Sequence, residues 1–263
     1  MSTLYRRELP FIVIAPQRLL IQMHIAYNMK FHEQVGRVIL KYRIKPIHVS
    51  SKHSGDLVEW DAILDVSEAG PMEVVVKEFK EIPGVAAITL SEPKQGFLVD
   101  AMHFPLTTRG GVPEMTFSIE MLAKMLMNFK KLYGSGAFSM LYEMGKYYGT
   151  EIGKHFKSIA LSARASISNR ELIDDFFNFM KSAGWFIPEV ELSEGEKPTA
   201  VLKLRECFED KHGERTSEPY CPFMRGFLTG FFNSVYEKEF TTQETKCISK
   251  GDPYCEFQIT TQP

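Results

Sequence analysis

Two cysteines late in the sequence, Cys247 and Cys255, lie on either side of a Lys-Gly-Asp-Pro segment that is typical of a turn. A turn there would bring the two thiols close together, as a disulfide, as half of a metal site or as two unrelated buried side chains. The sequence contains two further cysteines, Cys207 and Cys221. Structural zinc sites use four protein ligands, and thiolate sulfur is a preferred one.

The composition is that of an ordinary globular protein. The 263 residues are 44% hydrophobic and 24% charged, enough for one large core or two modest ones without disulfides. The net charge of −2 gives the whole chain no attraction for nucleic acid or anionic lipid, so we expect neither as a partner. Pro10, Pro16, Gln17 and Arg18 interrupt the apolar run near the N-terminus, which argues against a signal peptide or membrane span. We therefore expect a cytoplasmic protein, where clustered cysteines indicate a metal site more than a disulfide framework.

The N-terminal part of the sequence alternates between strand and helix patterns. Strands are predicted at 19–27, 44–51, 60–66 and 85–90, and helices at 31–42 and from Pro71 to the Ile-Pro-Gly segment at 82–84. In the third strand Trp60, Ala62 and Leu64 share one face, while Asp61 and Asp65 share the other. That alternation is typical of a half-buried strand.

The resulting order, βαββαβ, resembles the ACT family of ferredoxin-like regulatory modules. The resemblance implies a module that pairs its sheets in dimers and, in many members, binds an amino acid at the turn after the first strand. Here that turn is Tyr-Asn-Met-Lys-Phe at 27–31, without the glycine of the amino-acid-binding members. Amino-acid binding and dimerisation alone both remain open interpretations.

Three segments follow from these patterns. Residues 1–106 are expected to form the ACT-like regulatory and dimerisation domain, ending in one more strand at 95–106. The segment 107–114 is rich in Gly, Thr and Pro, and 115–132 has helical spacing with one apolar side, so 107–133 is a linker and connecting helix. That helix is a candidate dimerising or signalling arm. Residues 134–263 form the second domain.

The second domain reads as helices first and sheet after, an α+β fold. Gly145, Gly149 and Gly153 form one stripe of a predicted helix, where glycine costs up to about 1 kcal/mol relative to alanine. Either tight packing or room for a ligand would account for that stripe. A second helix begins at a Ser168 or Asn169 cap and ends at Gly184.

Cys221 begins a strongly apolar helix, and Glu244 lies three residues before Cys247. The run Cys221, Glu244, Cys247 and Cys255, with its Gly-Asp turn, resembles the 4-vinyl reductase domain, and within it the phenol-sensing domains of aromatic-catabolism activators. The resemblance covers roughly 134–260. It implies that these four residues hold one zinc ion, although Cys207 in place of Glu244 would give four thiolates instead. Four protein ligands leave no open position, so the expected zinc is structural.

The same resemblance implies a small apolar or aromatic ligand buried beside the zinc-held hairpin, contacted by Trp185 and His155. Apolar walls are expected from other aromatic side chains of this domain: Phe176, Phe179, Phe223, Phe227 and Tyr254. Ordinary core packing is the alternative for each of these rings. The charged segment 209–220 is expected to be exposed to solvent.

The favoured hypothesis is a cytoplasmic, ligand-responsive regulatory protein, a homodimer that acts on a regulatory protein partner. A second hypothesis is an accessory protein or enzyme of tetrapyrrole or hydrocarbon metabolism, and a third is a pure protein-interaction module. The sequence shows no GxGxxG motif after a strand and no flavin signature, so we expect a non-enzymatic role.

Overall fold

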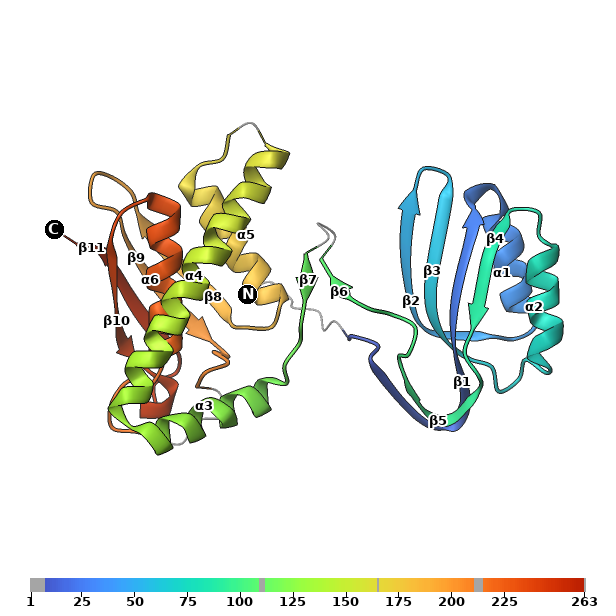
Figure 1. The fold of residues 1–263 in the computed structure, drawn as a ribbon, viewed down its shortest axis with the longest axis horizontal. Coiled ribbons are helices and arrows are strands. Elements are labelled where there is room, and N and C mark those ends of the chain that lie inside the picture. The colour runs from blue at the N-terminus through green and yellow to red at the C-terminus, as the bar shows by residue number, and fades with distance from the viewer. Residues whose placement is uncertain (1–7, 109–111, 165, 211–214, 263) are drawn as a thin grey trace. The chain divides into compact units, whose positions relative to one another are not determined.

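The structure is a computed structural model that describes residues 8–108, 112–164, 166–210 and 215–262 (Figure 1). It divides into two compact units, Met1–Met115 and Thr116–Pro263, which are described one at a time. The boundary between them falls within 107–133, the segment assigned above to the linker and connecting helix. Within the described part of the chain, no helix is both long enough and apolar enough to cross a membrane.

The N-terminal unit contains a five-stranded antiparallel sheet and two helices. Its strands run in the order β2-β3-β1-β4, and β5 pairs with the first part of the long strand β1. The elements are β1 (Ile12–Asn28), α1 (His32–Lys41), β2 (Lys45–Ser54), β3 (Leu57–Asp65), α2 (Met72–Glu81), β4 (Val85–Leu90) and β5 (Lys94–Val99). The βαββαβ order is the predicted one.

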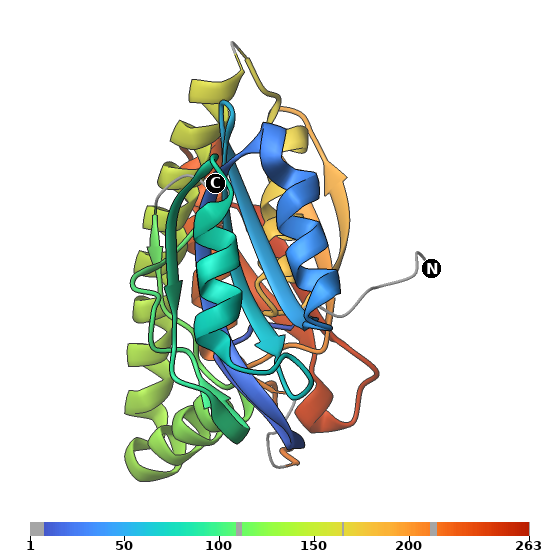
Figure 2. The same cartoon turned by 90° about the vertical axis from the view of Figure 1, so that its right-hand side faces the viewer.

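Helices α1 and α2 lie side by side over one face of this sheet (Figure 2). Val35 and Val38 of α1 and Phe79 of α2 are buried there against Met23 and Ile25 of β1. Because side chains alternate along a strand, the residues between those of β1 point to the opposite face. That face carries the polar residues discussed below.

The segment 95–106, expected to be one strand, is instead two short strands separated by a turn. Strand β5 ends at Val99, and the Asp100 carboxylate accepts hydrogen bonds from the backbone N–H groups of Met102 and His103. This local bonding replaces the pairing that a continuous strand would need. The short strands β6 (Leu106–Thr107) and β7 (Pro113–Glu114) then pair with each other.

The C-terminal unit places helices against a four-stranded antiparallel sheet of order β10-β11-β9-β8 (Figure 1). The predicted α+β class is confirmed. Its elements are α3 (Ile119–Tyr133), α4 (Ser135–Ala163), α5 (Asn169–Ser182), β8 (Ile187–Ser193), β9 (Thr199–Arg205), α6 (Pro222–Tyr236), β10 (Phe240–Lys246) and β11 (Cys255–Thr261). Helix α5 has the expected Ser168 cap, extended to a capping box by Glu171.

Helices α4 and α6 pack with their backbones in contact. A Cβ atom on Gly149 would lie 2.1 Å from the carbonyl oxygen of Phe227, and one on Gly230 would lie 2.0 Å from that of Lys146. Glycines line both sides of the contact: Gly145, Gly149 and Gly153 on α4, and Gly226 and Gly230 on α6. The glycine stripe therefore serves close helix packing, one of the two roles that the sequence left open.

Candidate metal centre and aromatic cluster

Three cysteines meet in the interior of the C-terminal unit. Cys221 precedes the first turn of α6, Cys247 follows β10, and Cys255 begins β11. Their side chains are buried, and the sulfur atoms of Cys221 and Cys255 lie 4.0 Å apart. One ligand atom from each of them, together with one from Asp210, lies within 4.8 Å of every other.

The turn between Cys247 and Cys255 is shaped by its own sequence. A short 3-10 helix, Ile248–Lys250, ends at Gly251, whose φ of 101° favours glycine. The Asp252 carboxylate accepts a hydrogen bond of 2.9 Å from the backbone N–H of Cys247. The Lys-Gly-Asp-Pro segment therefore forms the predicted turn and brings the two thiols together.

Asp210 is the member of this cluster that sequence reasoning missed. Its Oδ2 atom accepts a hydrogen bond of 2.7 Å from the Ser249 backbone N–H and lies 3.1 Å and 3.4 Å from the sulfur atoms of Cys247 and Cys255. Its Oδ1 atom is buried without a hydrogen-bond partner. The expectation of a solvent-exposed segment 209–220 is wrong at its start, because Asp210 and Glu209 are buried among bonding partners.

Glu244 of β10 lies beside the same cysteines in a similar state. Its Oε2 atom accepts a hydrogen bond of 3.0 Å from the backbone N–H of Cys221, and its Oε1 atom is buried without a partner. Asp210 and Glu244 therefore each have one fixed oxygen and one oxygen free to bind a cation. Buried carboxylate oxygens without a partner are costly, which marks both atoms as potential metal ligands.

The electrostatics of the cluster reflect acidic groups crowded together away from water. Burial, together with the neighbouring Cys247, raises the pKa of Asp210 to about 7 and that of Glu244 to about 9. Hydrogen bonds from the thiols of Cys221 and Cys255 lower the pKa of Cys207 to about 6. Cys207 thus lies against the other cysteines. Acidic groups packed in this way keep their protons unless a cation lies beside them.

The cluster of Asp210, Cys221, Cys247 and Cys255 can hold a metal ion. Soft thiolate sulfur with one carboxylate oxygen is a donor set that suits zinc, and the two unpartnered oxygens supply the carboxylate.

An aromatic cluster adjoins these residues around Trp185. The indole stacks on Tyr148 with ring centroids 5.8 Å apart and contacts Phe208 at 5.0 Å and Phe227 at 5.2 Å. Phe223 lies on a further side at 6.3 Å. Rings therefore occupy the space beside Trp185, where the sequence analysis expected walls for a ligand.

The other expected ligand contacts divide into two groups. Phe176 is fully buried and stacks on Phe231 at 4.0 Å, and Phe179 contacts Phe176 at the edge of the same core. Tyr254 instead accepts a hydrogen bond from Lys246, and His155 is exposed on α4.

Tyr148 and Phe208 were missed. Phe208 directly follows Cys207 in the sequence, so its position between cysteine and carboxylate was a signal that could have indicated it.

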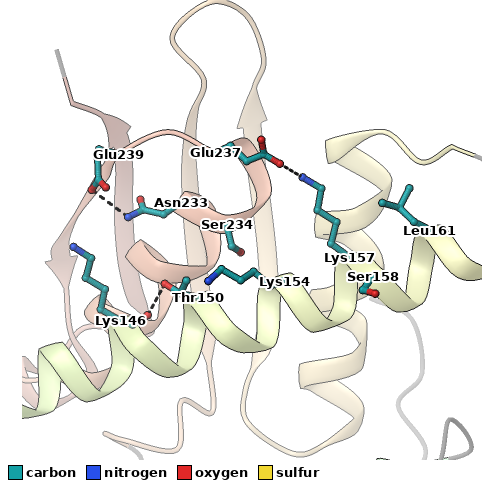
Figure 3. A pocket seen from close by; sticks show the side chains of 10 residues that line it. All are labelled: Lys146, Thr150, Lys154, Lys157, Ser158, Leu161, Asn233, Ser234, Glu237 and Glu239. Carbon is teal, nitrogen blue, oxygen red and sulfur yellow. Dashed lines mark hydrogen bonds and ion pairs between the residues drawn. The ribbon is translucent and has the colours of Figure 1, made fainter.

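The largest cavity described in the C-terminal unit is an open groove of about 740 Å³ along α4 and α6 (Figure 3). Its walls include Lys146, Lys154 and Lys157 of α4, with Asn233 and Glu237 opposite. Lys157 forms an ion pair of 2.8 Å with Glu237 across it. This groove is polar and does not touch Trp185, so it is not the apolar ligand site that the sequence analysis expected.

Known proteins share parts of this chain. Residues 200–261 match the family model of the 4-vinyl reductase domain. The chain is similar to the uncharacterized protein MJ0855 of Methanocaldococcus jannaschii, with 28% identity over 193 residues that cover 71% of this chain and 68% of that protein. It is also similar to the uncharacterized protein MJ0150 of the same organism, with 25% identity over 126 residues. That match covers 48% of this chain and 66% of MJ0150, slightly less than two thirds of its length.

Two solved structures are similar in fold. One is the phenol-responsive sensory domain of the transcription activator PoxR with phenol, with a TM-score of 0.51 and 15% identity over 58% of this chain and 78% of that chain. The other is a vinyl-4-reductase family protein from Methanocaldococcus jannaschii, with a TM-score of 0.37 and 16% identity over 57% of this chain and 85% of that chain. At such identities the PoxR likeness concerns the fold alone. The family match of residues 200–261 confirms the 4-vinyl reductase resemblance that the cysteine spacing indicated.

Proposed function

We propose that this chain is a ligand-responsive regulatory protein whose C-terminal unit binds a small apolar or aromatic molecule beside a zinc-stabilised hairpin. The observation that carries the proposal is the position of Phe208. Its ring contacts that of Trp185, and its backbone N–H donates a hydrogen bond of 3.0 Å to the Trp185 carbonyl oxygen. Its neighbours in sequence, Cys207 and Asp210, lie in the cysteine cluster. A molecule that displaces the Trp185 ring therefore acts directly on the segment beside the metal ligands.

In this proposal Cys221, Cys247, Cys255 and Glu244 hold the zinc, with Glu244 binding through Oε1. Asp210 is the competing carboxylate, since its ligand atom groups more closely with the three thiols. We favour Glu244 because the Cys221 backbone N–H fixes its other oxygen, and because Asp210 Oδ2 already serves Ser249. The zinc ties the start of α6 to the last hairpin.

The ligand class follows from the walls. Rings surround Trp185, and apolar or aromatic molecules of the size of phenol can replace one ring against the others. Tyr148 is the side of this enclosure that can open, because this residue is 41% exposed while Phe227 behind it is fully buried. PoxR, whose sensory domain has a similar fold, is phenol-responsive by description.

The regulator is further proposed to be a cytoplasmic homodimer that passes its signal to a protein partner, with the N-terminal unit as an ACT-like dimerisation module. Two features support association between copies. Strand β2 ends the sheet path, and α3 carries exposed Met121 and Met125. Unpaired sheet edges and exposed apolar side chains are both typical of surfaces that are covered in an assembly.

The experiment uses the two tryptophans of the chain, Trp60 and Trp185. In a Trp60→Phe variant all tryptophan fluorescence reports on Trp185. Phenol, and toluene as its apolar counterpart, are titrated into this variant. We expect a saturable change in emission, and calorimetry on Trp185→Leu should show binding weakened at least tenfold. Emission that changes only linearly with both compounds would overturn the proposal.

A further inference from the structure

The face of the N-terminal sheet opposite the helices carries a cluster of histidine and aspartate. His24 of β1 and Asp61 of β3 are direct partners in the antiparallel register, and His24 Nδ1 lies 2.8 Å from Asp61 Oδ1. His103, in the turn after β5, places its Nε2 atom 2.8 Å from the same oxygen. Two imidazole nitrogens from distant parts of the chain thus approach one carboxylate oxygen.

A second carboxylate holds His103 from behind. His103 Nδ1 lies 2.9 Å from Asp100 Oδ2, and Asp100 Oδ1 accepts a hydrogen bond of 2.7 Å from the Gln22 side-chain amide. Asp100 is only 14% exposed, so its position is well fixed. An outer carboxylate that binds one ring N–H and directs the other nitrogen inward is the arrangement found around metal-binding histidines.

The protonation of His103 follows from these contacts. Carboxylate oxygens only accept hydrogen bonds, so both ring nitrogens of His103 donate and the ring is an imidazolium. Burial lowers the pKa of His103, but hydrogen bonds to Asp61 and Asp100 outweigh it, and the pKa is raised overall. The proton between His103 Nε2 and Asp61 occupies the place that a cation would take.

The site is also accessible. The side chains of His24 and Asp61 are each 32% exposed, and that of His103 is 42% exposed. Half-exposed side chains can turn inward by the small distance that separates hydrogen-bonding from metal-binding geometry. Leu20, Ile63 and Leu98 form a small buried cluster on this side of the sheet, which gives the polar groups a firm apolar base.

We propose that His24 Nδ1, Asp61 and His103 Nε2 bind one divalent transition-metal ion, independently of the cysteine cluster. Two imidazoles and one carboxylate suit zinc, cobalt, nickel or iron(II). The ion replaces the Nε2 proton of His103, which is released to solvent, and water completes the coordination on the open side. Asp100 is a positioning residue that keeps the remaining proton on Nδ1.

Cobalt(II) is the probe, because cobalt bound by thiolate shows an intense near-ultraviolet charge-transfer band that cobalt bound by imidazole and carboxylate lacks. The full chain is titrated as wild type, His24→Gln, His103→Gln and His53→Gln. His53 is an exposed histidine of β2 and serves as the matched control. We expect wild type and His53→Gln to bind one more cobalt ion than the other two variants, with the thiolate band equal in all four.

Asp100→Asn should keep the site but weaken it by about 10- to 100-fold, as loss of an outer carboxylate does. Imidazole ¹⁵N spectra of the wild-type protein with zinc give a readout that needs no substitution, and signals of His24 and His103 should shift while that of His53 stays. Equal cobalt stoichiometry in wild type and both ligand variants, or imidazole signals unmoved by zinc, overturns the proposal.

Discussion

The ammonium group of Lys130 lies 2.9 Å from Oε1 of Glu209, and both side chains are shielded from solvent. Glu209 also accepts hydrogen bonds from the backbone N–H groups of Phe223 and Met224, which are otherwise unpaired at the start of α6. Lys130 donates a second bond to the Tyr220 carbonyl oxygen. This pair therefore fastens α3 to the end of α6 that follows Cys221.

Replacing Lys130 by methionine should destabilise the C-terminal unit by roughly 3–5 kcal/mol, because it leaves the Glu209 charge buried without a partner. Urea unfolding followed by Trp185 fluorescence in the Trp60→Phe background measures the change. Lys124→Met is the control, since the Lys124–Glu120 pair on the same helix is exposed and should contribute about 0.5 kcal/mol or less. Equal effects of the two substitutions would contradict the assigned role of the buried pair.

Zinc content separates the three candidates for the fourth metal ligand. Serine in place of Cys221, Cys247 or Cys255 should release the ion, and so should Glu244→Gln. Cys207→Ala should retain it, because we assign Cys207 to packing beside the cluster. Plasma mass spectrometry on protein purified without chelator gives the content directly.

The decisive comparison is between Glu244→Gln and Asp210→Asn, two changes that keep size and remove charge. Retention in the first with loss in the second would transfer the ligand role to Asp210. A wild-type protein that carries no metal after such a purification would remove the site from the proposal altogether.

Alanine at Gly149 should destabilise the C-terminal unit even though alanine favours helix. The added Cβ would meet the backbone of α6 at 2.1 Å, so the helices must separate, at a cost of about 1–3 kcal/mol. Gly136→Ala is the matched control on α4, since nothing lies within 4 Å of its new Cβ atom. That variant should be neutral or up to about 1 kcal/mol more stable. Thermal unfolding of both variants decides between close packing and spare room.

The chain should be a dimer at micromolar concentration in light scattering. The exposed side chains of Met121 and Met125 on α3 are the surface we expect to be covered. Glutamate at both positions should yield monomers, because association would then bury charge. A wild-type monomer under the same conditions would refute the dimer, and a dimeric double variant would place the contact elsewhere.

The N-terminal unit should lose stability in acid through Asp65. Burial raises the pKa of Asp65, but hydrogen bonds from Ser67 and the nearby Arg18 and Lys45 outweigh it, so its pKa is lowered overall. A lowered pKa stabilises the folded state above the unfolded value of about 4, and this contribution disappears as pH falls through the folded value.

Unfolding followed by Trp60 in a Trp185→Phe background should therefore show a midpoint that falls below about pH 4. Asp65→Asn should flatten this dependence, while Asp56→Asn, at an exposed turn, should keep it. An unchanged acid limb in Asp65→Asn would show that another carboxylate is responsible.

The cysteines were predictable from sequence because a glycine turn and a ligand spacing are local patterns. Asp210 was not, since a charged residue after a strand normally faces solvent and only the pairing of its neighbour Glu209 with Lys130, 79 positions earlier, takes that segment inside. His103 was missed for a related reason. Its partners Asp61 and His24 come from other strands, and a histidine in a turn gives no sign of which sheet face it will cover.

The order of strands in the C-terminal unit also bears on how the chain is made. Strand β11 lies between β10 and β9, so those two earlier strands have no direct pairing with each other in the described sheet. A ribosome must therefore synthesise the chain as far as Thr261 before the halves of this sheet can join. Until then Phe257 and Ile259, both fully buried in the folded unit, cannot cover the aromatic core, and Cys255 cannot meet Cys221. Assembly of the metal centre is thus a late, post-synthetic event, and a nascent chain stalled before β11 presents its apolar helices to chaperones.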